Sequence, residues 1–174
     1  MLTVTETPLN GVLLITPPTS HEDFRGSYLE VYNEREYKAA GIDIHFVQDD
    51  VSISYCHVLR GIHGDADTWK LVHCAYGRIY QVIVNNDPTS TQYLQWTGVL
   101  LSGENYYQVL IPPNFGNAFL VLSDIAAYAY KQSSYYRGAV HQFTLNPLDP
   151  RIGIYWPINK PILSERDAHA PFLP

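Results

Sequence analysis

Short apolar stretches recur along the chain, and their spacing predicts strands rather than helices. The stretches that we expect to form strands are residues 12–15, 26–32, 51–55, 71–76, 78–84, 93–101, 107–111, 118–122 and 126–130. Residues 51–55 show the clearest alternation of apolar and polar positions, which is typical of a β-strand because successive side chains point to opposite faces. Gly77 separates two of the stretches and predicts a tight turn between paired strands.

Turn-forming residues interrupt this pattern, and one segment is typical of a helix. Residues 112–114 contain two prolines, which cannot continue a sheet ladder because proline has no backbone N–H. Residues 33–40 carry Glu34 near their start and are closed by Gly41, which predicts a short helix. Many short strands with turn signals every ~8–12 residues predict an all-β sandwich or jelly roll with one or two short helices. The chain shows no internal repeat or linker, so we expect one domain over residues 1–174.

Composition places the chain among globular proteins. It has 174 residues and is 46% hydrophobic, which excludes a disordered or collagen-like chain. Its apolar runs are far shorter than the ~20 residues of a membrane-spanning helix. Residues 1–8 lack the basic and apolar regions of a secretory signal. Cys56 and Cys74 are too few for a disulfide scaffold. These features predict a cytoplasmic protein that does not bind a membrane.

Charge narrows the classes of partner. The chain has 11 Lys and Arg against 17 Asp and Glu, a formal net charge of −6. Proteins that bind nucleic acids or anionic membranes generally present a basic surface, so we expect no nucleic-acid partner. A phosphate-bearing ligand would need a local positive pocket. The 14 Tyr, 6 Phe and 3 Trp leave three interpretations open, namely a β-core, a dimer interface, or a wall on which a ring stacks.

The densest cluster of reactive side chains falls in residues 58–72. His63, Asp65 and Lys70 lie there together with an arginine, around two glycines. A metal site needs at least three N or O ligands, and this segment supplies a single histidine. Asn117, in a later polar segment, is a poor ligand for transition metals. We therefore expect neither a metal nor another cofactor.

Eight short motifs occur along residues 10–172 in a fixed order and spacing. They are Asp23-Phe-Arg-Gly-Ser-Tyr-Leu-Glu30, Val47-Gln-Asp-Asp-Val-Ser-Ile-Ser54, Leu59-Arg-Gly-Ile-His63, Lys70-Leu-Val72, Ile111-Pro-Pro-Asn-Phe-Gly-Asn-Ala-Phe119, Tyr128-Ala-Tyr-Lys131, Trp156-Pro157 and Leu163-Ser-Glu-Arg-Asp167. Each motif is weakly specific alone. In this order they resemble the dTDP-4-dehydrorhamnose 3,5-epimerase family of nucleotide-sugar enzymes.

The resemblance implies a cupin-type jelly roll, a homodimer with a swapped N-terminal strand, and epimerisation without a metal. The implied substrate is a nucleotide-linked 4-keto-6-deoxy sugar, inverted at C3, C5 or both. A proton next to a ketone is acidic only when the developing enolate is stabilised. Such a site therefore needs a base, a partner for the oxyanion, and an acid on the opposite face.

The family motifs imply roles for four residues of this chain. His63 matches the base, and an imidazole suits that task because it titrates near neutrality. Asp167 matches the carboxylate that orients the imidazole, as in a catalytic triad. Lys70 matches the cation beside the C4 oxygen, and Tyr130 matches the acid that returns a proton from the other face.

Other positions match residues that contact the ligand in the family. Arg25 and Arg60 match contacts to the nucleotide, with Arg60 at the diphosphate through bidentate hydrogen bonds. Glu30 and Gln48 match positions that line the base and sugar pocket. Because the chain is acidic, Arg25, Arg60 and Lys70 should stand out as a local positive pocket.

Three positions depart from the common family pattern. Asn117 stands where most of the family carries histidine, and an amide cannot act as a base, although it can bind a sugar oxygen. Gly64-Asp65 and residues 84–87, which lack an arginine, also differ. The variants at Gly64-Asp65 and Asn117 resemble a subgroup of bacterial epimerases that acts on GDP-linked 4-keto-heptoses, so the nucleotide and the sugar stay open. Apart from these departures, Tyr136 is a further candidate for the sugar pocket.

Three other functions are alternatives to an epimerase, and the sequence supports them to different degrees. A sugar-nucleotide 3,4-ketoisomerase uses similar enolate chemistry, and its product would carry a shifted carbonyl. A non-catalytic sugar-nucleotide-binding cupin would fit Asn117, but the retention of His63, Lys70, Tyr130 and Asp167 together favours an enzyme. A metal-dependent oxygenase lacks the required ligands.

Overall fold

The chain folds into two antiparallel β-sheets that face each other. The computed structural model describes residues 2–17 and 20–173. The six-stranded sheet has the order β1 (Thr3–Glu6), β2 (Leu13–Thr16), β10 (Gln108–Ile111), β7 (Lys70–Tyr76), β12 (Ile125–Gln132) and β5 (Gln48–Tyr55). The five-stranded sheet has the order β13 (Phe143–Thr144), β6 (Leu59–Gly64), β11 (Phe115–Val121), β8 (Arg78–Asn85) and β9 (Trp96–Ser102). The prediction of an all-β protein is confirmed.

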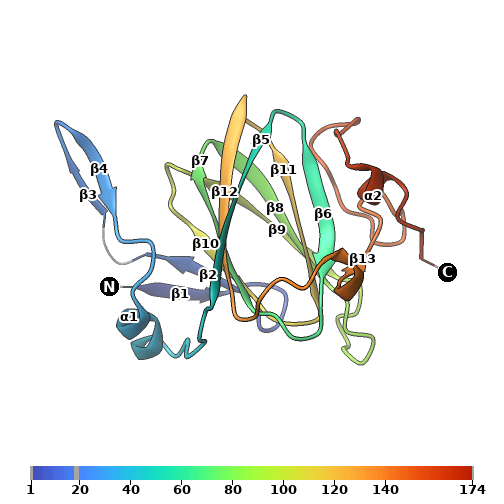
Figure 1. Ribbon diagram of the computed structural model, residues 1–174, viewed down its shortest axis with the longest axis horizontal. Helices are drawn as coiled ribbons and strands as arrows, with labels where there is room; N and C mark the ends of the chain where they lie inside the picture. Colours follow the sequence, from blue (N-terminus) through green and yellow to red (C-terminus); the bar gives the residue numbers. More distant parts are fainter. Residues whose placement is uncertain (1, 18–19, 174) are drawn as a thin grey trace.

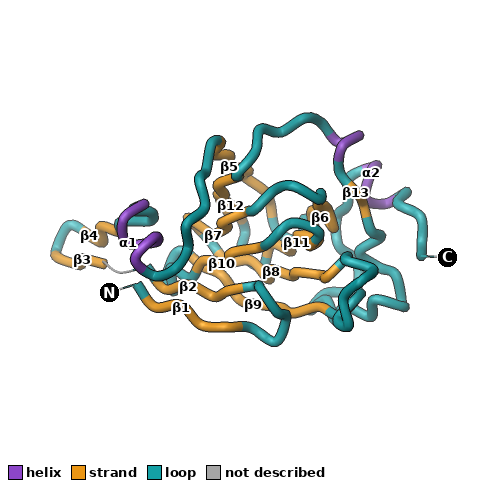
Figure 2. The backbone as a smooth tube through the Cα atoms, turned by 90° about the horizontal axis from the view of Figure 1, so that it is seen from below, coloured by secondary structure: helices purple, strands orange, loops and turns teal. Residues whose placement is uncertain are grey.

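Smaller elements lie at the two ends of this pair of sheets. Strands β3 (Ser20–Asp23) and β4 (Gly26–Leu29) form a hairpin that projects from one end of the molecule, the same end at which helix α1 (Glu34–Ala39) lies (Figure 1). Helix α2 (Glu165–Ala168) lies at the other end, and Figure 2 shows the same arrangement from below. A short 3-10 helix, Ala139–His141, precedes β13.

The predicted helix near residue 33 is confirmed, and its start follows a common rule. The side chain of Asn33 accepts a hydrogen bond from the backbone N–H of Arg35 at 3.2 Å, which satisfies one of the N–H groups left free at a helix start. Tyr37 is the buried residue of this helix, and it packs in one apolar cluster with Ile15 of β2 and Leu110 of β10.

The main core fills the space between the sheets. Inward-facing side chains of both sheets are almost fully buried there, among them Val72, Cys74, Ile79, Ile83, Val109, Val121 and Tyr128. A second cluster lies on the other face of the five-stranded sheet, where Ile152 and Trp156 cover Val82 and Val84. Strand β8 is therefore buried on both faces, which explains why residues 79–84 form a nearly continuous apolar run.

Several elements differ from the prediction. The stretch expected at residues 93–101 becomes a strand only at Trp96, because Leu94 adopts a left-handed φ of +63° within a turn. The stretch expected at residues 26–32 ends at Leu29. Strands β1, β3, β6 and β13 and helix α2 were not predicted.

Strand β6 escaped prediction because two glycines interrupt its apolar residues. Both are required by the close approach of β6 to β11. A Cβ on Gly61 would lie 2.6 Å from the backbone oxygen of Asn117, and Gly61 also has a φ of +118°. A Cβ on Gly64 would lie 2.3 Å from the backbone oxygen of Phe115. These glycines therefore allow β6, which carries His63, to pack closely against β11.

Two apolar surfaces of the described chain face solvent. On β5 the serines point toward the interior and the apolar residues point out, so that Val51, Ile53 and Tyr55 are exposed, Tyr55 by 72%. Tyr76 of β7 lies on the same face, and we call these four residues the outer patch. The second surface is the β3–β4 hairpin, where Phe24 is 98% exposed.

No helix among the described residues is long and apolar enough to span a membrane.

Candidate active site

A cavity of about 260 Å³ lies between the two sheets, at the end nearer α2. Its walls come from five strands, β5, β6, β7, β11 and β12, together with α2 and the segment after β12. The residues that line it are Ser52, Arg60, His63, Lys70, Asn117, Phe119, Tyr128, Tyr130, Gln132, Tyr136, Gln142, Ser164, Arg166 and Asp167.

His63 and Asp167 form a hydrogen-bonded pair in this cavity. Nε2 of His63 lies 2.6 Å from Oδ1 of Asp167, whose side chain is 2% exposed. Burial acts to raise the pKa of Asp167, but the hydrogen bond and charge of His63 and the N–H of Gly61 outweigh it and hold the pKa below its usual value. The carboxylate accepts the hydrogen of Nε2, so Nδ1 of His63 is the ring nitrogen with a free lone pair.

Helix α2 positions this carboxylate. Ser164 caps the helix by accepting a hydrogen bond from the N–H of Asp167 at 3.2 Å. The backbone N–H of Gly61 donates to Oδ2 of Asp167 at 3.3 Å, so the second carboxylate oxygen is also held. Asp167 is therefore fixed by both the helix and β6, and it holds His63 in one orientation.

Lys70 is a buried cation in the same cavity. It begins β7, is 6% exposed, and has no hydrogen-bond or ion-pair partner among the described residues. Burial lowers the pKa of Lys70, Asp65 acts in the opposite direction, and Arg166 adds to the lowering. A buried ammonium without a partner is costly, so its position favours a ligand that brings negative charge.

Tyr130 faces the cavity from the sheet opposite His63. It lies on β12, whereas His63 lies on β6 of the other sheet. Burial raises the pKa of Tyr130, as do Asp50 and Tyr136, while Arg60 opposes this effect. The phenol therefore keeps its proton at neutral pH and can donate it.

The structure brings most of the predicted site residues together at this cavity. They are His63, Lys70, Tyr130, Asp167, Arg60, Asn117 and Tyr136. Gln48 lies behind this wall, where its Oε1 accepts a hydrogen bond from the backbone N–H of Tyr136 at 2.9 Å. Gln48 therefore holds the segment that carries Tyr136 rather than lining the cavity.

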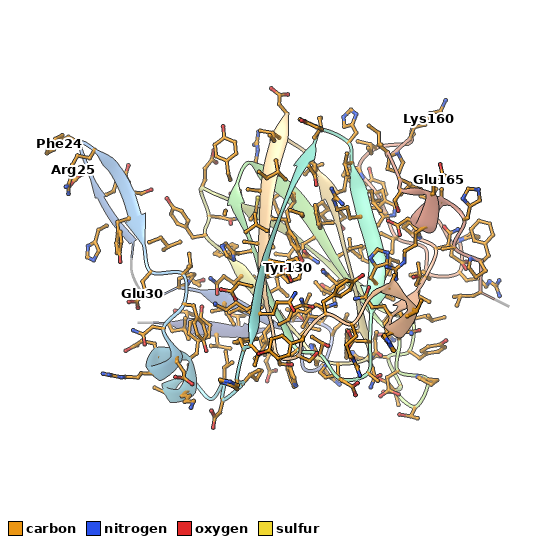
Figure 3. All side chains as sticks on the ribbon, viewed as in Figure 1. Phe24, Arg25, Glu30, Tyr130, Lys160 and Glu165 are labelled. Atoms are coloured by element: carbon orange, nitrogen blue, oxygen red, sulfur yellow. The ribbon has the colours of Figure 1, made fainter. Side chains whose placement is uncertain are left out.

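Arg25 and Glu30 lie away from the cavity of their own chain. Arg25 is at the tip of the β3–β4 hairpin, paired with Asp23 at 2.6 Å, and its side chain is 77% exposed. Glu30 follows the hairpin and accepts a hydrogen bond from Asn33 at 3.2 Å. Figure 3 shows Arg25 and Phe24 at the far end of the hairpin, well separated from Tyr130.

A family model describes nearly the whole chain. The model of dTDP-4-dehydrorhamnose 3,5-epimerase matches residues 6–174. The chain belongs to this family. The dTDP-4-dehydrorhamnose 3,5-epimerase of Salmonella typhimurium is 38% identical over 178 residues, which cover 99% of this chain and 96% of the relative.

Solved structures of the family share this fold. The enzyme of Legionella pneumophila, crystallised in complex with dTDP-4-keto-L-rhamnose, matches with a TM-score of 0.92 and 36% identity over 99% of this chain and 93% of the other. The enzyme of Bacillus anthracis, with TDP and PPi bound, matches with a TM-score of 0.93 and 34% identity over 99% of this chain and 100% of the other. The predicted cupin-type jelly roll of the epimerase family is confirmed.

Within one chain, the cavity holds two of the three cations that we expected in a positive pocket, together with one that we did not expect. We expected Arg25, Arg60 and Lys70 to form a positive pocket, but the cations that line the cavity are Arg60, Lys70 and Arg166. Arg166 donates from Nε and Nη2 to Oγ1 of Thr144 at 3.0 and 2.7 Å. It stands next to Asp167 in a recognised motif, but sequence reasoning gave it no role.

Other lining residues were also missed. The lining residues that were given no role also include Ser52, Phe119, Tyr128 and Ser164, which stand inside family motifs, and Gln132 and Gln142, which lie outside them. Among the described residues, no three His, Cys, Asp or Glu side chains gather as a group that could hold a metal ion.

Proposed function

We propose that this chain is an isomerase that inverts C3 and C5 of a dTDP-linked 4-keto-6-deoxy sugar. The observation that supports this proposal most directly is the placement of the His63–Asp167 pair and Tyr130 on opposite walls of one cavity, with Lys70 between the sheets. Inversion needs removal of a proton on one face and its return on the other. Because the ketone is at C4, it acidifies the hydrogens on both neighbouring carbons.

In the proposed reaction, His63 removes a proton from one face of the sugar and Tyr130 returns a proton to the other face. Nδ1 of His63 takes the proton from the carbon next to the ketone, and the electrons of that C–H bond form a C=C bond as the carbonyl oxygen becomes an enolate. The ammonium of Lys70 stabilises this oxyanion. When the ketone re-forms, the same carbon takes the proton of Tyr130 on the opposite face. His63 is then protonated and Tyr130 is a phenolate, and exchange with water restores both.

The guanidinium groups are suited to the anionic end of the substrate. Arg60 lies at the cavity on β6, and its Nε donates to Oγ of Ser54 at 2.9 Å, which directs the rest of the guanidinium. We propose that Arg60 binds the diphosphate, since a guanidinium matches two phosphate oxygens at once. The ligands of the Legionella and Bacillus relatives, dTDP-4-keto-L-rhamnose and TDP, favour dTDP over GDP. Both cysteines are free thiols, and we propose a cytoplasmic location.

Solvent exchange tests the proposed reaction. In D₂O the enzyme should incorporate deuterium at C3 and C5 of the dTDP-linked 4-keto sugar while it inverts both carbons. Tyr130→Phe should still allow exchange, because His63 can remove and return a hydrogen on one face, but inversion should fall by about 10²-fold or more. The measurement is NMR of the sugar protons over time.

The outcomes of this assay separate the alternatives. The same reaction is run with the GDP-linked substrate, and faster turnover there would replace dTDP by GDP in the proposal. A product with its carbonyl at C3 would identify a ketoisomerase. Full inversion by the Tyr130→Phe variant would show that another group is the acid, and binding without any exchange at either carbon would contradict the epimerase.

We further propose that the enzyme is a homodimer in which each hairpin reaches the cavity of its partner. The β3–β4 hairpin has little support from its own chain: among the described residues, Tyr106 to Ser27 is the side-chain hydrogen bond that joins it to the rest. An isolated two-stranded hairpin is marginally stable in water. The outer patch and Phe24 present large apolar side chains to solvent, which a second copy would bury.

Substitution of the outer patch tests the dimer. Ile53→Glu should convert the dimer to monomers, and substrate affinity should fall because Arg25 no longer reaches a second cavity. Sedimentation velocity and KM measure the two effects. Leu100→Glu, an equally drastic change on the exposed face of β9, is the control and should leave the dimer intact. A wild-type protein that sediments as a monomer at micromolar concentration would exclude this assembly.

A further inference from the structure

Two hydrogen-bond donors hold Asn117 in the cavity wall. Nε2 of Gln81 donates to Oδ1 of Asn117 at 2.6 Å, and the hydroxyl of Tyr128 donates to the same oxygen at 3.1 Å. The carbonyl side of the Asn117 amide is therefore occupied by the protein. Its NH₂ side has no partner among the described residues, and Asn117 lines the cavity.

Backbone oxygens determine the orientation of Gln81. Besides Asn117, Nε2 of Gln81 faces the backbone oxygen of Val82 at 3.1 Å and that of Ala118 at 2.9 Å. Carbonyl oxygens only accept hydrogen bonds, so the atom between them must be the NH₂ group. A rotated amide would place an oxygen against these oxygens.

The protein keeps this orientation at a cost. Gln81 is fully buried, and its Oε1 has no hydrogen-bond partner among the described residues. A buried acceptor without a partner typically costs about 1–3 kcal/mol. The two hydrogens of Nε2 are shared among the three acceptors, Oδ1 of Asn117 and the backbone oxygens of Val82 and Ala118. These contacts offset that cost, and they leave Gln81 able to act only as a donor toward Asn117.

We propose that Gln81 is a positioning residue that fixes Asn117 as a hydrogen-bond donor to the carbonyl oxygen of the substrate. Two backbone oxygens orient Gln81, Gln81 and Tyr128 fix the oxygen of Asn117, and the NH₂ of Asn117 faces the ligand. The inference rests on the proposed epimerase function and assigns to this site a second oxyanion donor beside Lys70.

The strand register places this donor beside the base. Asn117 on β11 is the direct partner of His63 on β6, and facing residues on paired strands have Cβ atoms about 4.5–5.5 Å apart. In an enolate, the oxygen is two bonds from the carbon that loses its proton. A donor next to His63 is therefore within reach of the oxygen when the imidazole faces that carbon. Unlike the histidine that most of the family carries at this position, Asn117 cannot act as a base. It instead supplies a hydrogen-bond donor of fixed direction.

Substitutions at two positions test this relay, the chain of hydrogen bonds from Gln81 through Asn117 to the substrate oxygen. Asn117→Ala should lower kcat by about 10²-fold, as loss of an oxyanion donor does elsewhere, with a much smaller change in KM. Asn117→Asp keeps the acceptor for Gln81 and Tyr128 but has no NH₂, so it should lose kcat at least as severely. Gln81→Ala should lower kcat by about tenfold, because the Asn117 amide can then rotate. In the double variant, Gln81→Ala should add no further loss to Asn117→Ala.

The control is Gln108→Ala, which removes another buried glutamine, on β10 and away from the cavity. It should leave kcat unchanged. Losses of kcat that add independently in the double-mutant cycle of Gln81→Ala and Asn117→Ala would contradict the relay. An Asn117→Asp variant with wild-type kcat would contradict it as well. The Asn117→Asp result decides the donor role even when Gln81→Ala does not fold. Wild-type enzyme that exchanges no deuterium would overturn the proposed function itself, whereas wild-type exchange with additive losses would overturn only this inference.

Discussion

Replacing His63 by asparagine should lower the rate of deuterium exchange at C3 and C5 by about 10³-fold, within the range by which general bases accelerate reactions. The amide has similar size and polarity but no nitrogen that can take a proton. Asp167 accepts a hydrogen bond from His63 at 2.6 Å in the wild type, and the asparagine NH₂ can replace that donor. The fold should therefore survive, and exchange is followed by NMR in D₂O together with a thermal unfolding curve.

The control for this substitution is His45→Asn, which removes an exposed imidazole that does not line the cavity. It should exchange deuterium at the wild-type rate. An active His63→Asn variant would show that another group removes the proton, and the assignment of the base would then be wrong.

Replacing Lys70 by methionine should have opposite effects on activity and stability. The ammonium is 6% exposed and lacks a partner among the described residues. Its removal should lower kcat by about 10²-fold or more, because the enolate oxygen loses its nearest positive charge. The free energy of unfolding should increase by on the order of 1 kcal/mol, because a buried charge without a partner destabilises the fold and methionine fills the same space with apolar atoms. Turnover and urea unfolding measure the two quantities.

Lys160→Met provides the comparison, since Lys160 is exposed on the C-terminal segment (Figure 3). It should change neither turnover nor unfolding appreciably. If Lys70→Met were less stable than wild type, the ammonium would have a stabilising partner in the protein. If its kcat were unchanged, Lys70 would not stabilise the oxyanion.

The sequence predicted the class of fold because strand signals are local. Alternation and turn residues located most strands between residue 48 and residue 132, and the run at residues 79–84 reflects a strand buried on both faces. Strand β6 was missed because its glycines serve contacts with β11, which local patterns do not report. The β3–β4 hairpin was predicted only in part, since few contacts with its own chain define it.

The site was predicted only as far as family motifs reached. His63 and Lys70 lie in one dense segment, but no spacing rule connects His63 with Asp167, which is 104 residues away. Gln81 stood within an apolar strand and gave no signal of its own. Its effect depends on a contact with Asn117, 36 residues along the chain, and on backbone oxygens that only the folded sheet brings together.

The separation between His63 and Asp167 also has a consequence during protein synthesis. All strands of both sheets precede α2 in the chain, so every strand is synthesised before the carboxylate that orients His63. A domain generally folds as a unit, and α2 with its capping residue contributes Ser164, Arg166 and Asp167 to the cavity wall. The unfinished chain therefore has neither a complete cavity nor an oriented base, and proton abstraction can begin only once α2 has been made.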